Sequence, residues 1–302
     1  MKRIIISIVF IIVLVPLNAQ WTAKTDTKRH HYLQIAAKGG VNTFLYKGSS
    51  IRLSGGGGLL YDYYFLPFMG FGTGAEISVL RSVYHIKDIS YQQQAIDDDP
   101  LFGTSGQSFL FCVDIENANE VQQATMLYVP LMLRFRFGYF YLGTGVKAGF
   151  CINARHKKNM GLLKTYGVYE NVYEPGILED IPEHGFVMKS SVTKRFSYDL
   201  KTDWAVCLDF GINIHPSPYN NRVGRRTKWA QHVYLGVYAD YGINNLQKSS
   251  TTNPVKEYPV IYNTNVEGCL EYDENSIVNS VTGKGVHSFS AGIKFAVGLN
   301  WR

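Results

Sequence analysis

The sequence is poor in charged residues and has no apolar run long enough for a membrane-spanning helix. Asp, Glu, Lys and Arg make up 18% of its 302 residues, against roughly 25% in typical soluble domains. Disorder is excluded all the same, because 14% of the residues are aromatic and disordered segments contain few aromatic residues. A helical membrane protein is excluded because the longest apolar run, residues 4–17, is shorter than the ~20 residues that cross a bilayer as a helix.

The N-terminus has the three parts of a secretory signal peptide. Met1, Lys2 and Arg3 give it a positive start, residues 4–15 are apolar, and residues 16–20 are turn-prone. We expect a signal peptide over residues 1–19 and a periplasmic N-terminal segment over residues 20–31, the alternative being a single membrane anchor. Removal of Lys2 and Arg3 lowers the formal charge below the +6 of the full chain, which is too small to indicate nucleic acid as a partner.

Apolar and polar residues alternate along much of the chain, and no long segment has the apolar spacing of a helix. In residues 124–137, Leu127 and Leu131 share one parity, while Arg134 and Arg136 share the other. Such alternation is typical of a strand with one apolar face, and about 9–11 residues suffice for a tilted strand to cross a membrane. The pattern predicts eight strands, at residues 32–46, 55–65, 70–86, 124–137, 139–153, 203–214, 232–245 and 287–301.

The polar parity of these eight strands carries both charges and glycines. Each strand contributes at least one charge, and glycines such as Gly72 and Gly143 recur on the same side. Glycine suits the crowded interior of a narrow barrel better than the open face of a β-sandwich, which is the alternative fold. The charges predicted to line the lumen are Lys38, Asp62, Glu76, Arg134, Arg136, Lys147, Asp209, Asp240 and Lys294.

The connections between the predicted strands alternate in length. Residues 66–69 and Gly138 are short turns, whereas residues 87–123, 154–202 and 246–286 are long. Short periplasmic turns and long outer loops are expected of outer-membrane barrels. The prediction is therefore an all-β protein with an eight-stranded antiparallel transmembrane up-and-down β-barrel over residues 32–302 and long extracellular loops. Strand-like pieces inside the loops would extend the hairpins above the membrane or make ten strands; they lie at residues 109–115, 186–192 and 259–262.

Three pieces of sequence resemble a known family. They are Asn18-Ala19-Gln20 at the end of the signal peptide, residues 127–137, and the glycine-rich strand that follows. Together they resemble the outer-membrane β-barrel family of Bacteroidetes, which includes PorT-like proteins. The resemblance implies a small outer-membrane barrel, commonly of unassigned function, and some relatives are similar to components of type IX secretion. It implies no catalytic motif, and the ending Trp301-Arg302 departs from the terminal aromatic residue of the family.

The nine lumen charges predict an interior filled by ion pairs. Buried charges need partners, and an eight-stranded barrel is just wide enough for side chains to fill it. We expect Glu76 to reach Arg134 or Arg136 on the next strand, which would close the lumen. A narrow gated conduit is the alternative.

The four cysteines allow disulfides, because export makes them permissible. Cys151 and Cys207 have the inward parity near the outer ends of neighbouring strands, so they could form a disulfide. Cys112 and Cys269 lie in outer loops and could pair with each other. None of the four has the spacing of metal ligands, and no metal or cofactor is predicted.

Catalysis is not indicated by the histidines or by the acidic loop. His232 and His287 lack a serine two residues further along, where a strand would place it on the same face. The loop over residues 87–123 is predicted to be a solvated acidic surface, although hard cations could bind there. It holds one Lys and seven acids, Asp88, Asp97, Asp98, Asp99, Asp114, Glu116 and Glu120.

The expected function is therefore non-enzymatic. The protein is predicted to lie in the cell outer membrane as a monomer, surrounded by lipid and lipopolysaccharide, with a structural or interaction role. Its long outer loops would bind a protein or glycan partner. The alternatives are a narrow or gated porin-like transport protein and an accessory component of type IX secretion.

Overall fold

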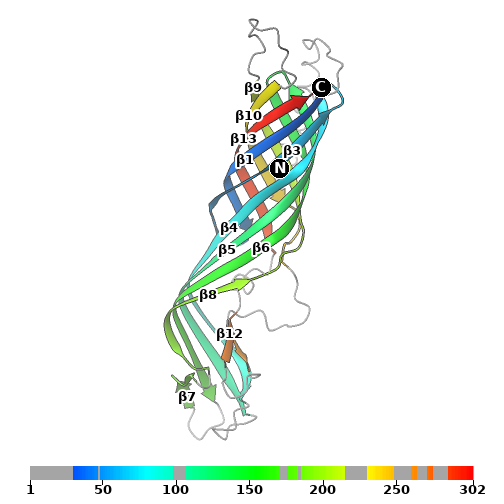
Figure 1. The fold of residues 1–302 in the computed structure, drawn as a ribbon. Coiled ribbons are helices and arrows are strands. Elements are labelled where there is room, and N and C mark those ends of the chain that lie inside the picture. Colours follow the sequence, from blue (N-terminus) through cyan, green and yellow to red (C-terminus); the bar gives the residue numbers. More distant parts are fainter. Residues whose placement is uncertain are drawn as a thin grey trace, which may run out of the picture.

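The computed structural model describes residues 30–46, 48–97, 107–169, 176–182, 185–214, 230–247, 260–263, 271–274 and 285–301. Nearly all of them are in antiparallel strands (Figure 1). Within these ranges, no helix is long and apolar enough to cross a membrane. The predicted signal peptide and Cys269 lie outside the described residues. His30 already belongs to the first strand, so the segment predicted over residues 20–31 ends in the barrel.

Eight strands form a closed ring in which every neighbour is antiparallel. The ring closes where the first strand pairs with the last, from His31 opposite Trp301 to Leu45 opposite His287. The prediction of an eight-stranded barrel, rather than ten strands or a sandwich, is confirmed. The order around the ring is β1 (His30–Leu45), β3 (Leu53–Tyr64), β4 (Met69–Asp97), β5 (Gln107–Phe137), β6 (Phe140–Tyr169), β9 (Asp203–Ile214), β10 (Ala230–Gly242) and β13 (His287–Trp301).

The outer face of the ring is apolar and exposed. Ile35 is 68% exposed and Ile293 62%, and every ring strand presents further large apolar side chains on this face, Phe71, Leu131, Phe150, Val206 and Val237 among them. Soluble monomers rarely expose a continuous apolar surface of this size, whereas a transmembrane barrel needs one around its waist. This belt therefore faces lipid.

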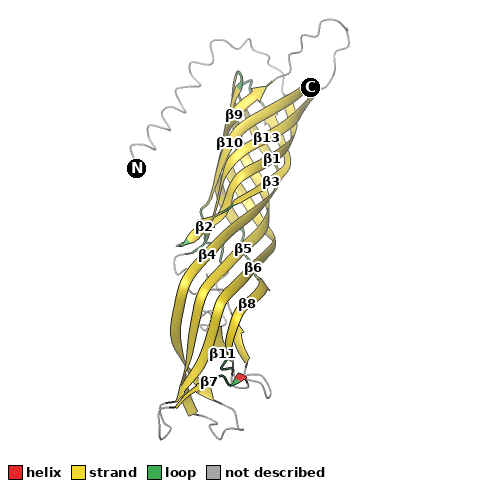
Figure 2. Ribbon diagram, turned by 90° about the vertical axis from the view of Figure 1, so that its left-hand side faces the viewer, coloured by secondary structure: helices red, strands yellow, loops and turns green. Residues whose placement is uncertain are grey.

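The two ends of the barrel differ. At the turn end, residues 65–68 join β3 to β4 and residues 138–139 join β5 to β6. Strand β1 begins at this end and β13 finishes there. At the opposite end, which we call the arm end, β4, β5 and β6 do not stop at the rim. Figure 2 shows these three strands continuing far beyond the barrel as one curved, twisted sheet.

This extension, the arm, is built mainly from the C-terminal part of β4, the N-terminal part of β5 and the C-terminal part of β6. Beyond His85, β4 pairs with β5 up to Asp97 opposite Gln107. At about 3.4 Å per residue, about 13 residues extend roughly 40 Å along the strand. Beyond Arg155, β6 pairs with β8 (Met188–Ser197) and then β7 (Gly176–Glu179). The remaining short strands are β2 (Ser49–Ile51), β11 (Val260–Asn263) and β12 (Glu271–Glu274).

Much of what was predicted as loop is therefore strand. Residues 109–115 lie inside β5, and β8 and β11 begin close to the other two strand-like pieces. The acidic loop prediction needs a correction at Glu120. This residue is fully buried, as is Lys158, which lies directly opposite it on β6.

One row of residues explains why the sequence of the arm does not show a continuous alternation of apolar and polar residues. Lys87, Asn117 and Gly161 lie side by side on β4, β5 and β6. Between this row and the barrel, the even-numbered residues of β5 are buried. Between this row and the tip of the arm, the odd-numbered residues are buried. Asn117 has φ of 50°, a left-handed conformation in which Asn is enriched. Its turn of the backbone keeps the apolar side chains on one side of the sheet although their parity changes.

The arm has an apolar core of its own. Phe109 stacks on Tyr169 with ring centroids 4.8 Å apart, and the ring of Phe111 lies 5.2 Å from that of Tyr262. Phe186 packs between these aromatic residues and is fully buried. A sheet this narrow would be marginal alone, so this core makes the arm an ordered structure.

Candidate functional site

The inward-facing charges form two ion-pair layers, each made by alternate strands of the ring. The arm-side layer takes one residue each from β1, β4, β6 and β10, and consists of Lys38, Glu76, Lys147 and Asp240. The turn-side layer takes one each from β3, β5, β9 and β13, and consists of Asp62, Arg134, Asp209 and Lys294. Each layer holds two cations and two anions, so each is neutral.

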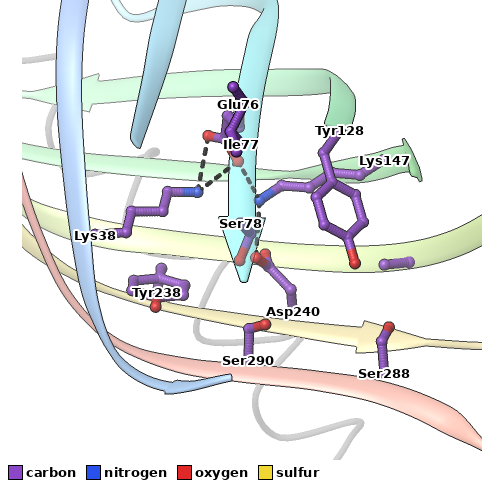
Figure 3. A pocket seen from close by; sticks show the side chains of 11 residues that line it. Lys38, Glu76, Ile77, Ser78, Tyr128, Lys147, Tyr238, Asp240, Ser288 and Ser290 are labelled. Atoms are coloured by element: carbon purple, nitrogen blue, oxygen red, sulfur yellow. Dashed lines mark hydrogen bonds and ion pairs between the residues drawn. The ribbon is translucent and has the colours of Figure 1, made fainter. Parts of the chain in front are cut away.

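Glu76 and Lys147 are central to the arm-side layer (Figure 3). Lys38 Nζ lies 2.8 Å from Glu76 Oε1, and Lys147 Nζ lies 2.8 Å from Glu76 Oε2. Lys147 Nζ also donates to Asp240 Oδ2 at 2.8 Å. Tyr238 adds a ring face 5.0 Å from Lys38 Nζ. Two ammonium groups thus share two carboxylates across the full width of the lumen.

Asp209 is central to the turn-side layer. Its Oδ2 accepts from Arg134 Nη1 at 2.8 Å and from Lys294 Nζ, while its Oδ1 accepts from Tyr141 OH at 3.1 Å. Arg134 Nε also lies 3.1 Å from Asp62 Oδ1, and Asp62 Oδ2 accepts from the amide of Gln34. Every charged group in this layer therefore has a charged partner.

The predicted contact between Glu76 and Arg134 or Arg136 is wrong. Glu76 lies opposite Tyr128 in the register of β4 and β5, whereas Arg134 lies opposite Gly70. Strands of a closed barrel are tilted, so inward residues of adjacent strands stand at different heights and those of alternate strands are level. Glu76 and Arg134 therefore belong to different layers.

Arg136 lies outside both layers, at the turn end. Its Nη1 donates to Tyr32 OH at 2.6 Å. Tyr32 in turn packs edge-on against Tyr64 and against His232, with centroids 5.4 and 5.2 Å apart. Tyr234 lies next along this side of the lumen and packs against Tyr141. This end of the lumen is thus filled by aromatic rings.

The arm end of the lumen is closed by an apolar cap. Leu200, Leu246 and Val286 come from the segments that leave the barrel, and pack on Phe44 and Met126 inside it. Backbone hydrogen bonds hold the cap together: Lys201 N donates to Leu246 O, and Leu246 N donates to Val286 O, both at 2.9 Å. The cap is therefore anchored to the barrel mouth.

Little empty space remains between the closed ends. Two cavities border the charged layers, one beside Tyr128 and Ser290 and one beside Met132 and Arg134, and each has a volume of about 10 Å³. A cavity of this size holds about one water molecule. Neither of these two cavities has room for a solute.

Several polar residues of the lumen were missed in the sequence. Asp203 is fully buried, and its Oδ2 accepts from Tyr128 OH at 2.8 Å. It shares the parity of Asp209, which was the available signal, but it stands at the first position of β9. Tyr141 and Gln34 were also missed, because an inward tyrosine or glutamine has no charge to mark it.

Two glycines leave the space that the turn-side layer occupies. A Cβ on Gly72 would contact Asp62 Oδ1 and Arg134 Nε, and one on Gly143 would overlap with Arg134 Nη1. Their recurrence on the charged parity therefore has a steric reason. The guanidinium group of Arg134 lies where side chains at these positions would be.

The disulfide predicted between Cys151 and Cys207 is not formed, and the thiols of Cys112 and Cys207 are free. Cys207 lies opposite Gly145 on β6, so Cys151 is six residues further along, or about 20 Å. Disulfides need Cα atoms within about 7 Å. Burial raises the pKa of the Cys112 thiol, which disfavours the reactive thiolate.

No protein-family model matches the chain. No curated protein sequence matches it either. Among solved structures, it is similar to Ail, the attachment invasion locus protein of Yersinia pestis, in complex with the heparin analogue sucrose octasulfate. That match has 10% identity and a TM-score of 0.31, and covers 91% of this chain and 99% of Ail.

Two further matches are weaker still. The TodX deltaS2S3 mutant monoaromatic hydrocarbon channel gives 10% identity and a TM-score of 0.13, with 90% of each chain covered. A Pseudomonas aeruginosa FadL homologue gives 9% identity and a TM-score of 0.12, covering 91% of this chain and 90% of that one. Such scores assign neither a family nor a ligand. The narrower resemblance to PorT-like proteins stays a prediction, and the geometry of the chain is that of an outer-membrane-type β-barrel.

Proposed function

We propose that this protein lies in the outer membrane with a closed lumen and uses its arm to bind a partner at the cell surface. The lipid-facing belt supports the membrane location, because a closed antiparallel barrel is the β structure that satisfies all its backbone groups in lipid. The short connections at the turn end support a periplasmic position for that end. The arm then stands outside the cell.

The arm is the observation that carries the proposed interaction role. Three barrel strands continue without a break into a sheet with a buried aromatic core, and such a structure exceeds what anchoring a barrel requires. Its outward face carries polar groups, with exposed Gln94 and Glu116 and an ion pair of 2.8 Å between Lys164 and Glu179, beside a few exposed apolar side chains such as Ile96. A protein or glycan is the partner class that such a polar surface fits.

Photo-crosslinking in native outer membranes tests the proposed interaction. A crosslinking amino acid at Gln94 or Glu116 is expected to give a discrete adduct on cells, whereas one at Ile77, half-exposed on the belt, gives lipid adducts only. Replacing residues 86–118 and 160–192 each by Asn-Gly joins paired strands by short hairpin turns. This armless chain should still form the barrel, and it should no longer bind the partner at the cell surface. Protein adducts confined to Ile77 would contradict the role of the arm.

A closed lumen predicts that the wild-type protein carries no steady current in planar lipid bilayers. Glu76→Gln removes the carboxylate shared by Lys38 and Lys147, so it should lower the thermal unfolding temperature more than it changes conductance. A stable current through the wild type, lost when the arm-side layer is altered, would instead support a transport function.

A further inference from the structure

A row of cations crosses the outer face of the sheet just beyond the apolar belt. Arg81 on β4 and Arg155 on β6 are both exposed and are aligned in register through Gln123 of β5. Arg52 extends the row, because it follows the pair of Ile51 with Ser82 and so lies beside Arg81. At about 4.8 Å between strands, the row spans roughly 15 Å.

The next row adds two more cations on neighbouring strands. Lys157 of β6 lies directly opposite Arg195 of β8, and like charges directly opposite each other destabilise a strand pair. Arg155 Nε has one weak polar contact, to Asn153 Oδ1 at 3.3 Å. We call these five residues the basic band: Arg52, Arg81, Arg155, Lys157 and Arg195.

Carboxylates are absent from the described outer-face positions of these two rows. The other residues there are Gln123, Ser197, Ser50, Val83 and Val121. Asp199 follows beyond the end of β8, and the exposed Asp88 and Glu116 lie several residues further up the arm. Along this face the order away from the turn end is thus apolar, then basic, then mixed in charge, since Lys87, Lys164 and Lys189 lie near Asp88 and Glu116. A band of cations without carboxylates, directly beyond the apolar belt, matches an anionic ligand that lies next to the hydrocarbon.

The height of the basic band is set by the belt below it. Ile77, Leu127 and Phe150 form the last row in which all three residues are apolar, although Val79 and the exposed Ile152 follow it. Arg81 follows Ile77 by four residues. With about 3.4 Å per residue and a strand tilt of about 40°, the Arg81 backbone stands roughly 10 Å above Ile77 of the same strand. Phosphates attached to the headgroup of a membrane lipid lie within reach of long cationic side chains at this height.

We propose that the basic band binds the phosphorylated headgroup of a glycolipid in the surrounding outer leaflet. Phosphate oxygens accept hydrogen bonds from guanidinium groups in a bidentate geometry, and one anion between Lys157 and Arg195 offsets their repulsion. The inference rests on the orientation given under the proposed function, with the arm outside. It does not depend on a partner for the arm.

Lipid binding by the full-length protein in phosphatidylcholine nanodiscs tests this inference. The probes are bisphosphorylated lipid A and the same lipid after enzymatic removal of its phosphates, with binding measured by native mass spectrometry. The wild type is expected to prefer the phosphorylated form at least tenfold. Arg81→Gln, Arg155→Gln and Arg195→Gln together should reduce this preference to about twofold or less, and the corresponding Arg→Lys triple variant should retain most of it.

The matched control removes three charges elsewhere on the arm. Lys87→Gln, Lys164→Gln and Lys189→Gln should leave the lipid preference unchanged, and heat-dependent migration on gels checks that each variant folds. Equal binding of the two lipids by the wild type would overturn the inference, as would equal losses in both triple variants. Displacement of the lipid by heparin at lower concentration than by inorganic phosphate would assign the band to a sulfated polysaccharide instead. An armless chain that keeps the preference separates this site from the arm's partner.

Discussion

Asp209→Asn is expected to lower the free energy of unfolding of the barrel by about 3 to 5 kcal/mol, the usual cost of leaving a buried charge without its partner. Asp209 accepts from both Arg134 and Lys294. An amide oxygen would still accept one hydrogen bond, but the turn-side layer would carry one excess positive charge. Urea unfolding in detergent micelles, followed by tryptophan fluorescence and gel migration, measures the loss.

Glu179→Gln is the matched control for Asp209→Asn. Glu179 forms an ion pair with Lys164 of the same length as that between Asp209 and Arg134, 2.8 Å, but its side chain is 46% exposed, against 7% for Asp209. Exposed ion pairs contribute about 0 to 1 kcal/mol, so this variant should unfold like the wild type. Equal losses in the two variants would show that burial does not determine the strength of the layer.

Phe111→Ala is expected to destabilise the arm by about 3 to 5 kcal/mol and to leave the barrel folded. Phe111 is fully buried against Phe186 and Tyr262, far along β5 from the charged layers. The arm should then be cleaved by protease at concentrations that spare the wild type. The barrel fragment should still migrate as a folded species on unheated gels.

Ile96→Ala serves as the control for Phe111→Ala, because Ile96 lies on the same arm and is 54% exposed. Its truncation leaves no cavity, so protease resistance should stay close to that of the wild type. If Phe111→Ala instead lowered the stability of arm and barrel together, the two would form one cooperative unit.

The strands of the barrel could be predicted because their signal is local. Alternation along residues 124–137 requires only the next few residues to be read, and the charged parity was assigned correctly at Glu76, Arg134 and Asp209. The arm could not be predicted in the same way. At Asn117 the parity of the buried face changes by one residue, so residues 87–123 lose their pattern although their pairing continues without a shift.

The partners of the lumen charges could not be predicted because they depend on the shear of the closed ring. Glu76 and Arg134 are on neighbouring strands, yet strand tilt separates them and brings Lys147 from two strands away to Glu76. The register between neighbouring strands also determines whether the two cysteines can form a disulfide. Cys151 and Cys207 share a parity and neighbouring strands, and their separation along the register is not visible in either segment alone.

The alternate-strand layers have a consequence for how the chain enters the membrane. Taken in chain order, the eight layer charges fall into four consecutive strand pairs, Lys38 with Asp62, Glu76 with Arg134, Lys147 with Asp209, and Asp240 with Lys294. Each pair of strands brings one cation and one anion, although these are not partners in the finished barrel. A barrel that grows two strands at a time therefore brings no net layer charge into lipid at any step, and unbalanced charges are costly there. The ion pair between Asp209 and Lys294 can form only once β13, the last strand, has been added.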